Sequence, residues 1–275
     1  MIKHYLKVAF RNLIKYKTQS LVSIIGLAVG FTCFALSVLW IRYEMTYDNF
    51  HEGADRIYLV RAHYANEPGT SKFTPYPLMK YLQDKMPEIE AVTAFTAHYV
   101  KFRMEDTEQE IGMIAADSVF MNFFDIQLLK GTVNFLKSDG QEVAITKEFA
   151  KRLFSKEEDA LGKEVEVGRR VCKIGAIVSG WSNHSNIPYN ILAPARHSPQ
   201  WGSSNEQLLI RVRERTDIDA FRTKMSTVCI NDIEKESELS DLLITRMSAL
   251  RYSDYVDKAD VVISFSYIFY FSLAG

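Results

Sequence analysis

Cysteine is scarce in this sequence. Three cysteines occur among 275 residues, which argues against a small domain held together by several disulfides. Cys33 lies in an apolar run, whereas Cys172 and Cys229 follow it and could pair in principle. Two cysteines this far apart do not make a disulfide framework, so unpaired thiols are the preferred interpretation.

The motifs of several enzyme classes are also missing. The chain has no G-x-x-x-x-G-K-[ST] phosphate loop, no G-x-S-x-G elbow, no H-E-x-x-H and no C-x-x-C. These patterns support nucleotide binding, nucleophilic catalysis, zinc binding and thiol chemistry, respectively. The sequence therefore predicts no enzyme, no cofactor and no metal site.

The six histidines are scattered along the chain. His51 lies near Glu52 and Asp55, which together could hold a cation, although a solvated polar surface is the preferred interpretation. His184 and His197 fall in polar stretches between apolar segments and are expected at the surface.

Charge is absent from residues 21–41, LVSIIGLAVGFTCFALSVLWI, which also lack proline. A helix of this length spans about 30 Å, the thickness of the hydrocarbon core of a bilayer. Because lipid offers no hydrogen bonds to the backbone, a helix is the expected conformation. The sequence predicts a transmembrane helix over residues 21–41.

Acidic residues are absent from residues 1–20, which hold five basic ones. Positive charge is retained on the cytoplasmic side of a membrane, so we expect the N-terminus inside and the following domain outside. A cleavable signal peptide is the alternative, because residues 35–37 weakly resemble a cleavage site. The apolar run is too long for a signal peptide, which favours an uncleaved anchor.

The basic residues before the span form a pattern of their own. Four of the five recur every four residues, whereas apolar residues fall on the opposite face. Such a helix lies in the headgroup plane of a membrane and turns its basic face toward anionic lipid. The membrane-surface candidates are Lys3, Lys7, Arg11 and Lys15. An ordinary basic flank is the alternative.

Two glycines lie one turn apart within the span. Gly26 and Gly30 form a G-x-x-x-G pattern, which allows a second helix to approach closely. Such patterns also arise by chance in apolar helices. Packing against another transmembrane helix is therefore a hypothesis about these two residues.

The residues after the span form an acidic folded body. All 34 acidic residues and 28 of the 33 basic residues follow it, which gives a net charge of −6. An acidic surface argues against nucleic-acid binding. Aromatic residues make up 12% of the chain, which is typical of a folded domain and not of a disordered tail.

Elements in the body follow a β-α-β order at both ends. At the start we expect a strand at 56–65, a helix at 78–86, and one or two bent strands over 91–104. Near the end we expect a strand at 208–212, a helix at 217–231 and a strand at 242–250. Thr216 and Asp219 suggest a capping box for that helix.

The middle of the body contains shorter elements. We expect a helical turn at 118–124, a helix capped by Thr146, and a hairpin turning at Gly168 and Arg169. The residues thus predict a membrane-anchored α+β protein in which two β-α-β ends flank a mixed middle.

Residues 261–274 form a second apolar run, VVISFSYIFYFSLA. It is shorter than a complete membrane helix. We interpret it as the start of a second, truncated transmembrane helix, with an amphiphilic tail packed on the body as the alternative.

Several short motifs, taken in order, resemble the MacB/FtsX-type ABC transporter permeases. The match begins with AFRNL at 9–13 and GLAVGF at 26–31, and continues with YDNFH at 47–51 and ADRIY at 54–58. Weaker matches follow at residues 123–124, 128–131, 143–146, 150, 153–154 and 161–163. Each motif alone is weak, and their order and spacing over almost the whole chain carry the resemblance.

The resemblance implies a domain organisation. It consists of a cytoplasmic interfacial helix (1–20), a first transmembrane helix (21–41), a periplasmic core domain (42–260) and the start of a second transmembrane helix (261–275). The fold class it implies is a membrane-anchored α+β protein whose extracytoplasmic domain is βαβ-rich, at about 55–105 and 205–252, and is split by a β-rich inserted subdomain at about 110–200.

The resemblance also implies a function. It predicts a permease subunit of an ABC-type exporter in the bacterial inner membrane, which dimerises and pairs with a separate cytoplasmic ABC ATPase. ATP hydrolysis would then move the periplasmic domain, a scheme called mechanotransmission. A membrane-anchored sensing or binding domain is the alternative, and a membrane-anchored enzyme is disfavoured because no catalytic constellation occurs.

Overall fold

A computed structural model describes residues 2–65, 67–105, 107–232 and 238–252. These described residues divide into two compact units, one up to residue 46 and one from residue 47 onward. The predicted second transmembrane segment at 261–275 lies outside the described residues.

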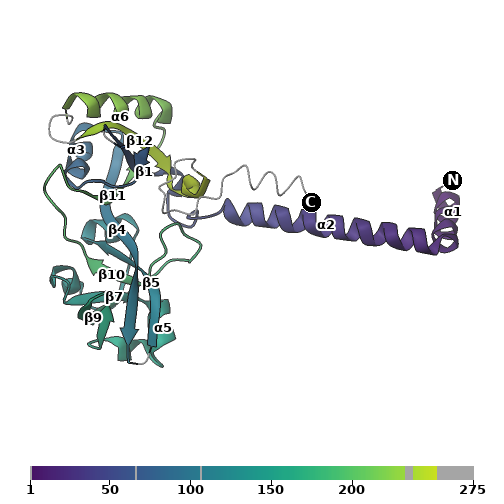
Figure 1. Cartoon of the computed structure of the whole chain (residues 1–275), viewed down its shortest axis with the longest axis horizontal. Coiled ribbons are helices and arrows are strands. Elements are labelled where there is room, and N and C mark those ends of the chain that lie inside the picture. Colours follow the sequence, from purple (N-terminus) through teal and green to yellow (C-terminus); the bar gives the residue numbers. More distant parts are fainter. Residues whose placement is uncertain (1, 66, 106, 233–237, 253–275) are drawn as a thin grey trace. The chain divides into compact units, whose positions relative to one another are not determined.

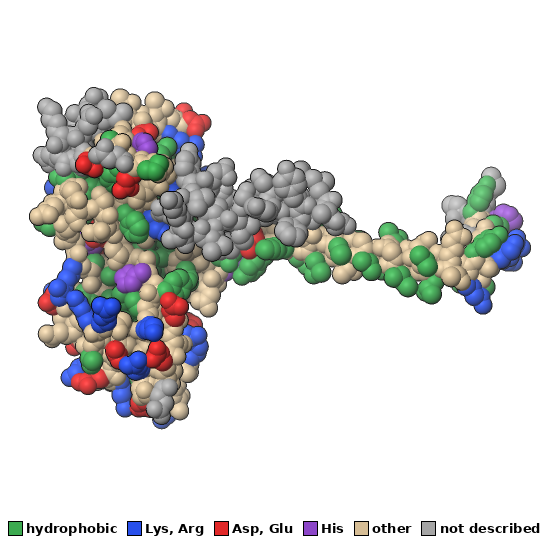
Figure 2. Space-filling model, viewed as in Figure 1, with side chains coloured by type: hydrophobic (Ala, Val, Ile, Leu, Met, Phe, Trp, Pro, Cys, Tyr) green, Lys and Arg blue, Asp and Glu red, His purple; other side chains and the backbone are tan. Residues whose placement is uncertain are grey.

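The first unit contains two helices, α1 (Ile2–Lys15) and α2 (Lys17–Glu44). α2 is long and apolar enough to cross a membrane, and Figure 2 shows hydrophobic side chains along its length. It is longer at both ends than the predicted span. Two of its hydroxyl groups are bonded within the helix, since Thr32 donates to the carbonyl of Ala28 and Ser37 to that of Cys33.

The second unit is a mixed α/β domain (Figure 1). Its helices are α3 (Pro77–Lys85), α4 (Ser118–Phe123), α5 (Lys147–Leu153) and α6 (Ile218–Asp232). Its strands are β1 (Ile57–Tyr64), β2 (Thr70–Ser71), β3 (Thr74–Pro75), β4 (Ile89–Met104), β5 (Thr107–Ala116), β6 (Leu128–Gly131), β7 (Glu142–Thr146), β8 (Glu164–Val167), β9 (Arg170–Val178), β10 (Ile191–Pro194), β11 (Ser204–Val212) and β12 (Leu239–Arg246). Short 3₁₀ turns include η1 (Ala54–Arg56), η2 (Val133–Lys137), η3 (Glu157–Ala160) and η4 (Met247–Tyr252).

The main path of the sheet runs β12-β1-β11-β4-β5-β10-β7-β9-β6 among the described residues. The strands β12, β1, β11 and β4 are antiparallel neighbours and come from both ends of the domain sequence. We call them the outer half. The strands from β5 to β10 form the inserted half, in which β10 pairs parallel to β5 and β7 pairs parallel to β9.

The long strand β4 belongs to both halves. Its first part pairs with β11 as far as Phe95, and from Phe95 onward it pairs with β5. The prediction of one or two bent strands over 91–104 therefore resolves to one continuous strand.

Three buried clusters hold the domain together. The first packs α3 and α6 on the outer half, with Leu78, Leu82, Phe221 and Met225 against strand residues such as Val60. The second joins the two halves and includes Leu59, Leu209, Phe95 and Phe120. The third lies in the inserted half beside α5. Because burial of apolar area is the main stabilising term in folding, the second cluster couples the halves energetically.

Local sequence signals explain several elements. The Thr146 hydroxyl accepts the Phe149 backbone N–H at 3.3 Å, which confirms the predicted cap of α5. β8 and β9 pair as a hairpin whose turn contains Gly168 at φ +66°, as predicted. Pro77 occupies the first turn of α3, where its missing N–H costs nothing.

Two element predictions near the end of the domain are wrong. The predicted strand over 242–250 ends at Arg246, and η4 follows. The capping box is also wrong: the Asp217 carboxylate accepts the N–H groups of Asp219 and Ala220, whereas the Thr216 hydroxyl donates back to the carbonyl of Arg213. Asp217 stands one position closer to the helix, where its oxygen reaches the free amides of the first turn.

Cys172 is free and buried in the third cluster. Burial raises the pKa of its thiol to about 11, so it remains protonated and unreactive at neutral pH. The side chain of Cys229 lies outside the described residues.

Candidate functional site

The residues that follow α2 are fixed to the domain through one buried carboxylate. We call residues 47–53 the exit segment. Asp48 has no solvent exposure, and its carboxylate accepts the Ser185 hydroxyl, the Asn186 backbone N–H at 3.0 Å and the Asn186 side-chain amide at 2.5 Å. Its own N–H donates to the carbonyl of His184 at 3.3 Å.

The same contacts gather three distant segments. The rings of Tyr47 and His184 lie 3.9 Å apart. The Asn186 side-chain amide also donates to the carbonyl of Met247 at 3.2 Å. The exit segment, the loop at 181–187 and η4 are therefore joined at Asp48, which we call the Asp48 anchor.

Burial raises the pKa of the Asp48 carboxyl above its ordinary value, although the hydrogen bonds from Ser185 and Asn186 oppose this shift. Asp48 also has a left-handed backbone, with φ +59°. Aspartate tolerates this conformation better than most residues because its short side chain bonds locally. The burial of the carboxyl and the left-handed backbone both indicate that tertiary contacts determine the conformation of Asp48.

The loop that follows Asn186 packs closely against β5. A Cβ added at Gly112 would meet the carbonyl oxygen of Pro188 at 2.4 Å. Glycine at this position is therefore required for the loop after Asn186 to pack against the strand.

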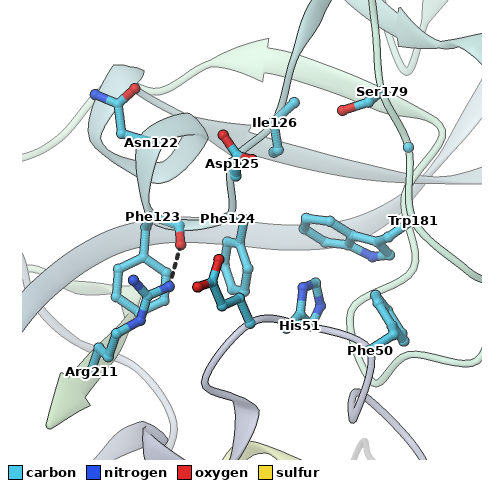
Figure 3. A pocket seen from close by; sticks show the side chains of 12 residues that line it. Phe50, His51, Asn122, Phe123, Phe124, Asp125, Ile126, Ser179, Trp181 and Arg211 are labelled. Carbon is cyan, nitrogen blue, oxygen red and sulfur yellow. Dashed lines mark hydrogen bonds between the residues drawn. The ribbon is translucent and has the colours of Figure 1, made fainter.

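A cavity of about 510 Å³ lies beside the exit segment. It is lined by Phe50, His51, Glu52, Asn122, Phe123, Phe124, Asp125, Ile126, Ser179, Gly180, Trp181 and Arg211. These residues come from the exit segment, the end of α4, the segment after β9, and β11 (Figure 3).

One wall of the cavity is aromatic. The His51 ring lies 4.2 Å from Phe50, 4.7 Å from Phe124 and 4.9 Å from Trp181, measured between ring centroids. The indole N–H of Trp181 donates to the carbonyl of Ile187 at 3.0 Å, which fixes its orientation. The wall is thus a rigid set of packed rings.

His51 is neutral in this wall. Its side chain is 7% exposed, and burial, assisted by the positive charge of Arg211, lowers its pKa to about 4. Its Nε2 lies 4.0 Å from the Asp48 carboxylate, beyond hydrogen-bond distance. An ion pair over this distance requires a protonated histidine. Because the pKa of His51 is lowered, the ring is neutral at neutral pH and no ion pair with Asp48 forms.

Three charged side chains line the cavity. Arg211 donates to the carbonyl of Phe123 at 2.6 Å and lies 4.7 Å above the Phe123 ring. Asp125 accepts the Gln127 side-chain amide at 2.6 Å, and Glu52 is exposed. Within the described part of the chain, Arg211, Asp125 and Glu52 form no ion pair.

The histidine predictions need correction. His51 is packed among rings instead of lying on a solvated surface, because Phe124 and Trp181 cover it. His197 is also largely buried: it stacks on Tyr76 at 4.1 Å and lies 3.2 Å from a Glu206 oxygen. No group of three or more His, Cys, Asp or Glu residues could hold a metal ion among the residues described.

The sequence-predicted site residues all lie in the other unit. Lys7, Arg11 and Lys15 are exposed on α1, whereas the side chain of Lys3 lies outside the described residues. A Cβ added at Gly26 or Gly30 meets no described atom within 4 Å, so either position can accept a partner helix. Their roles in lipid binding and helix packing stay predictions.

Sequence reasoning missed both the anchor and the cavity. Asp48 and Ser185 are separated by 137 positions, and no local pattern pairs them. The YDNFH motif at 47–51 was the available signal, because an acidic residue among aromatics directly after a span is unusual for a solvated linker.

The described residues form a mixed α/β domain that is preceded in the chain by a helix long and apolar enough to cross a membrane. Residues 20–228 match the family model of the MacB-like periplasmic core domain. The chain belongs to this family and carries the extracytoplasmic core domain of an ABC-type transporter permease.

Solved structures agree at the level of the fold. A domain of a protein described as a permease from Porphyromonas gingivalis has a TM-score of 0.57 and 20% identity, over 71% of this chain and 92% of that chain. The extracellular domain of the noncanonic ABC-type transporter YknZ from Gram-positive bacteria has a TM-score of 0.50 and 14% identity, over 69% of this chain and 99% of that chain. Comparison with curated proteins found no match.

Proposed function

We propose that the chain is the N-terminal portion of a permease subunit of an ABC-type exporter in the bacterial inner membrane. Its N-terminus lies in the cytoplasm and its core domain in the periplasm. A separate cytoplasmic ATPase hydrolyses ATP, and the permease converts this into movement of the periplasmic domain.

The observation that carries the proposal is the Asp48 anchor. Movement of a helix end passes to a domain only if the residues between them are stiff, since a flexible linker absorbs it. Three residues separate the last residue of α2, Glu44, from Asp48, and Asp48 is fully buried and bonded to two side chains. The chain is therefore fixed to the domain at Asp48, shortly after α2, which supports mechanical coupling.

The proposal includes two further partners. A second permease copy would pack on the Gly26 and Gly30 face of α2, because glycine allows close backbone approach in lipid. Anionic lipid would bind the basic face of α1, where Lys7, Arg11 and Lys15 are exposed.

The test uses the full-length permease co-expressed with a candidate ABC ATPase. Spin labels on the periplasmic domains of a dimer should report a distance change when ATP is added to membranes. The change should be lost when the ATPase is replaced by a variant that binds ATP but cannot hydrolyse it. Asp48→Gly in the permease should reduce the change. If no ATPase co-purifies, or the distance ignores ATP, the proposal is wrong.

A further inference from the structure

The cavity beside the exit segment has the size of a small-molecule site. Its volume of about 510 Å³ lies within the range of roughly 300–1,000 Å³ found for ligand pockets. Such sites combine an apolar wall with a few charged or polar groups that orient the ligand. Both features are present here.

The charges on the cavity are of both signs. Arg211 supplies one cation, and Glu52 and Asp125 supply two carboxylates, none of them in an ion pair with a described residue. In Figure 3, Arg211 lies at one side of the cavity and Asp125 with Asn122 at another. A ligand with a single charge would meet one favourable and one repulsive group, whereas a zwitterion can satisfy both.

The aromatic wall adds a third requirement. Phe50, Phe124 and Trp181 line the cavity with His51, and His51 is neutral, so the wall repels neither charge. Phe50 is 45% exposed despite its size, which leaves ring surface for a ligand to cover. Aromatic faces attract both apolar groups and ammonium cations.

From these observations we propose that the cavity binds a small zwitterionic molecule with an aromatic or apolar group, of the size of a dipeptide. Its anionic end contacts Arg211, its cationic end contacts Glu52 and Asp125, and its apolar group packs on the Phe124 and Trp181 wall.

Binding would also fix the exit segment more firmly. Phe50, His51 and Glu52 belong to the exit segment, whereas Trp181, Asp125 and Arg211 belong to the rest of the domain. A ligand that contacts both sets stabilises their present arrangement by its binding free energy. The site would thus let the domain respond to a periplasmic molecule. The binding step itself does not rest on the proposed transport function.

The test compares three forms of one probe on the full chain in detergent micelles. L-alanyl-L-phenylalanine is a zwitterion, its N-acetyl derivative keeps only the anion, and its C-terminal amide keeps only the cation. Isothermal titration calorimetry should give a dissociation constant of about 1 mM or below for the zwitterion. Each derivative should bind about tenfold more weakly, because one charge-assisted contact is lost.

Substitutions in the cavity test which side chains contact the anionic and the cationic end of the ligand. Arg211→Gln should weaken binding of the zwitterion and the N-acetyl form but not of the amide. Glu52→Gln combined with Asp125→Asn should weaken the zwitterion and the amide but not the N-acetyl form. Asn is chosen at position 125 because it tolerates the left-handed backbone there. Glu110→Gln is the matched control, because it removes an exposed carboxylate outside the cavity.

Arg211→Gln also removes a hydrogen bond to Phe123, so the unfolding temperature of this variant is measured as well. If Arg211→Gln fails to fold, the Glu52→Gln and Asp125→Asn variant still tests the proposal. The proposal is overturned if the zwitterion does not bind by about 10 mM, if the three probes bind equally, or if the variants match the control. ATP-dependent movement in the full-length permease is a separate readout, so failure here leaves the proposed function standing.

Discussion

At the scale of single residues, Asp48 combines two requirements that substitutions can separate. Asp48→Asn keeps one acceptor oxygen and tolerates φ +59°, so it should cost about 1 kcal/mol of unfolding free energy. Asp48→Gly tolerates the backbone but removes both oxygens, leaving the Ser185 and Asn186 donors unpaired at a cost of about 2–3 kcal/mol. Asp48→Ala adds the left-handed strain, roughly 1 kcal/mol more.

Urea unfolding of the full chain, followed by tryptophan fluorescence, measures this series. Asn183→Ala, in the same loop but exposed, serves as the control and should change stability little. Equal losses for Asp48→Asn and Asp48→Gly would contradict a role for the hydrogen bonds.

His51 should make stability depend on pH. Burial lowers its pKa to about 4 from an ordinary value of 6.5, so the unfolded chain binds more protons than the folded one between these values. Stability should therefore fall as pH falls from about 6.5 to 4, by about 3 kcal/mol in total. Asp48, whose pKa is raised, acts in the opposite direction above pH 3.8.

The comparison with His51→Phe isolates the histidine. Phenylalanine keeps the packing with Phe124 and Trp181 and does not titrate, so the difference in stability between the two proteins should grow toward low pH. Unfolding midpoints at pH 7, 6, 5 and 4.5 measure it. A constant difference over this range would show that His51 is not neutralised by burial.

At the scale of elements, α2 presents small residues along one face. Ser23, Gly26, Gly30, Cys33 and Ser37 recur at alternating intervals of three and four residues, the spacing of a helix-packing seam. The hydroxyl of Ser37 is bonded within its own helix, so the face carries no unpaired donor there. This periodicity extends the predicted Gly26 and Gly30 contact along most of the span.

Gly26→Leu and Gly30→Leu should therefore weaken permease assembly. Leucine fills the space that close approach needs, whereas neither position contacts a described atom of the same chain. Ala28→Leu adds bulk on the opposite face of α2 and is the matched control. Cross-linking of the full-length permease in membranes should show fewer dimers for the glycine variants, and dimer yields equal to the control would exclude the seam.

The elements also show what the sequence could predict. Thr146 and Gly168 mark their elements through local bonds and backbone freedom, so propensity and capping rules found them. β4 and the end of β12 were less certain, because strand length is set by pairing with partner strands, here β5 and β1. The Asp48 anchor and the cavity join segments remote in sequence, so no local rule could place them.

At the scale of the whole domain, β4 and the second buried cluster should make the two halves unfold together. Phe95 stands where β4 changes partner from β11 to β5; it is fully buried and lies 5.3 Å from the Phe120 ring. Phe95→Ala should cost about 3–5 kcal/mol, and the loss should appear in both halves. Phe149→Ala, in the third cluster, removes the same side chain from the inserted half alone.

Hydrogen exchange measured by mass spectrometry distinguishes these outcomes. For Phe95→Ala, the amides of β1 and β11 and those of β7 and β9 should lose protection by the same free energy, because one cooperative unit opens. If protection falls only in one half, the halves are separate folding units, and β4 could not transmit force between them. Rigid transmission from the exit segment through the domain requires the cooperative result.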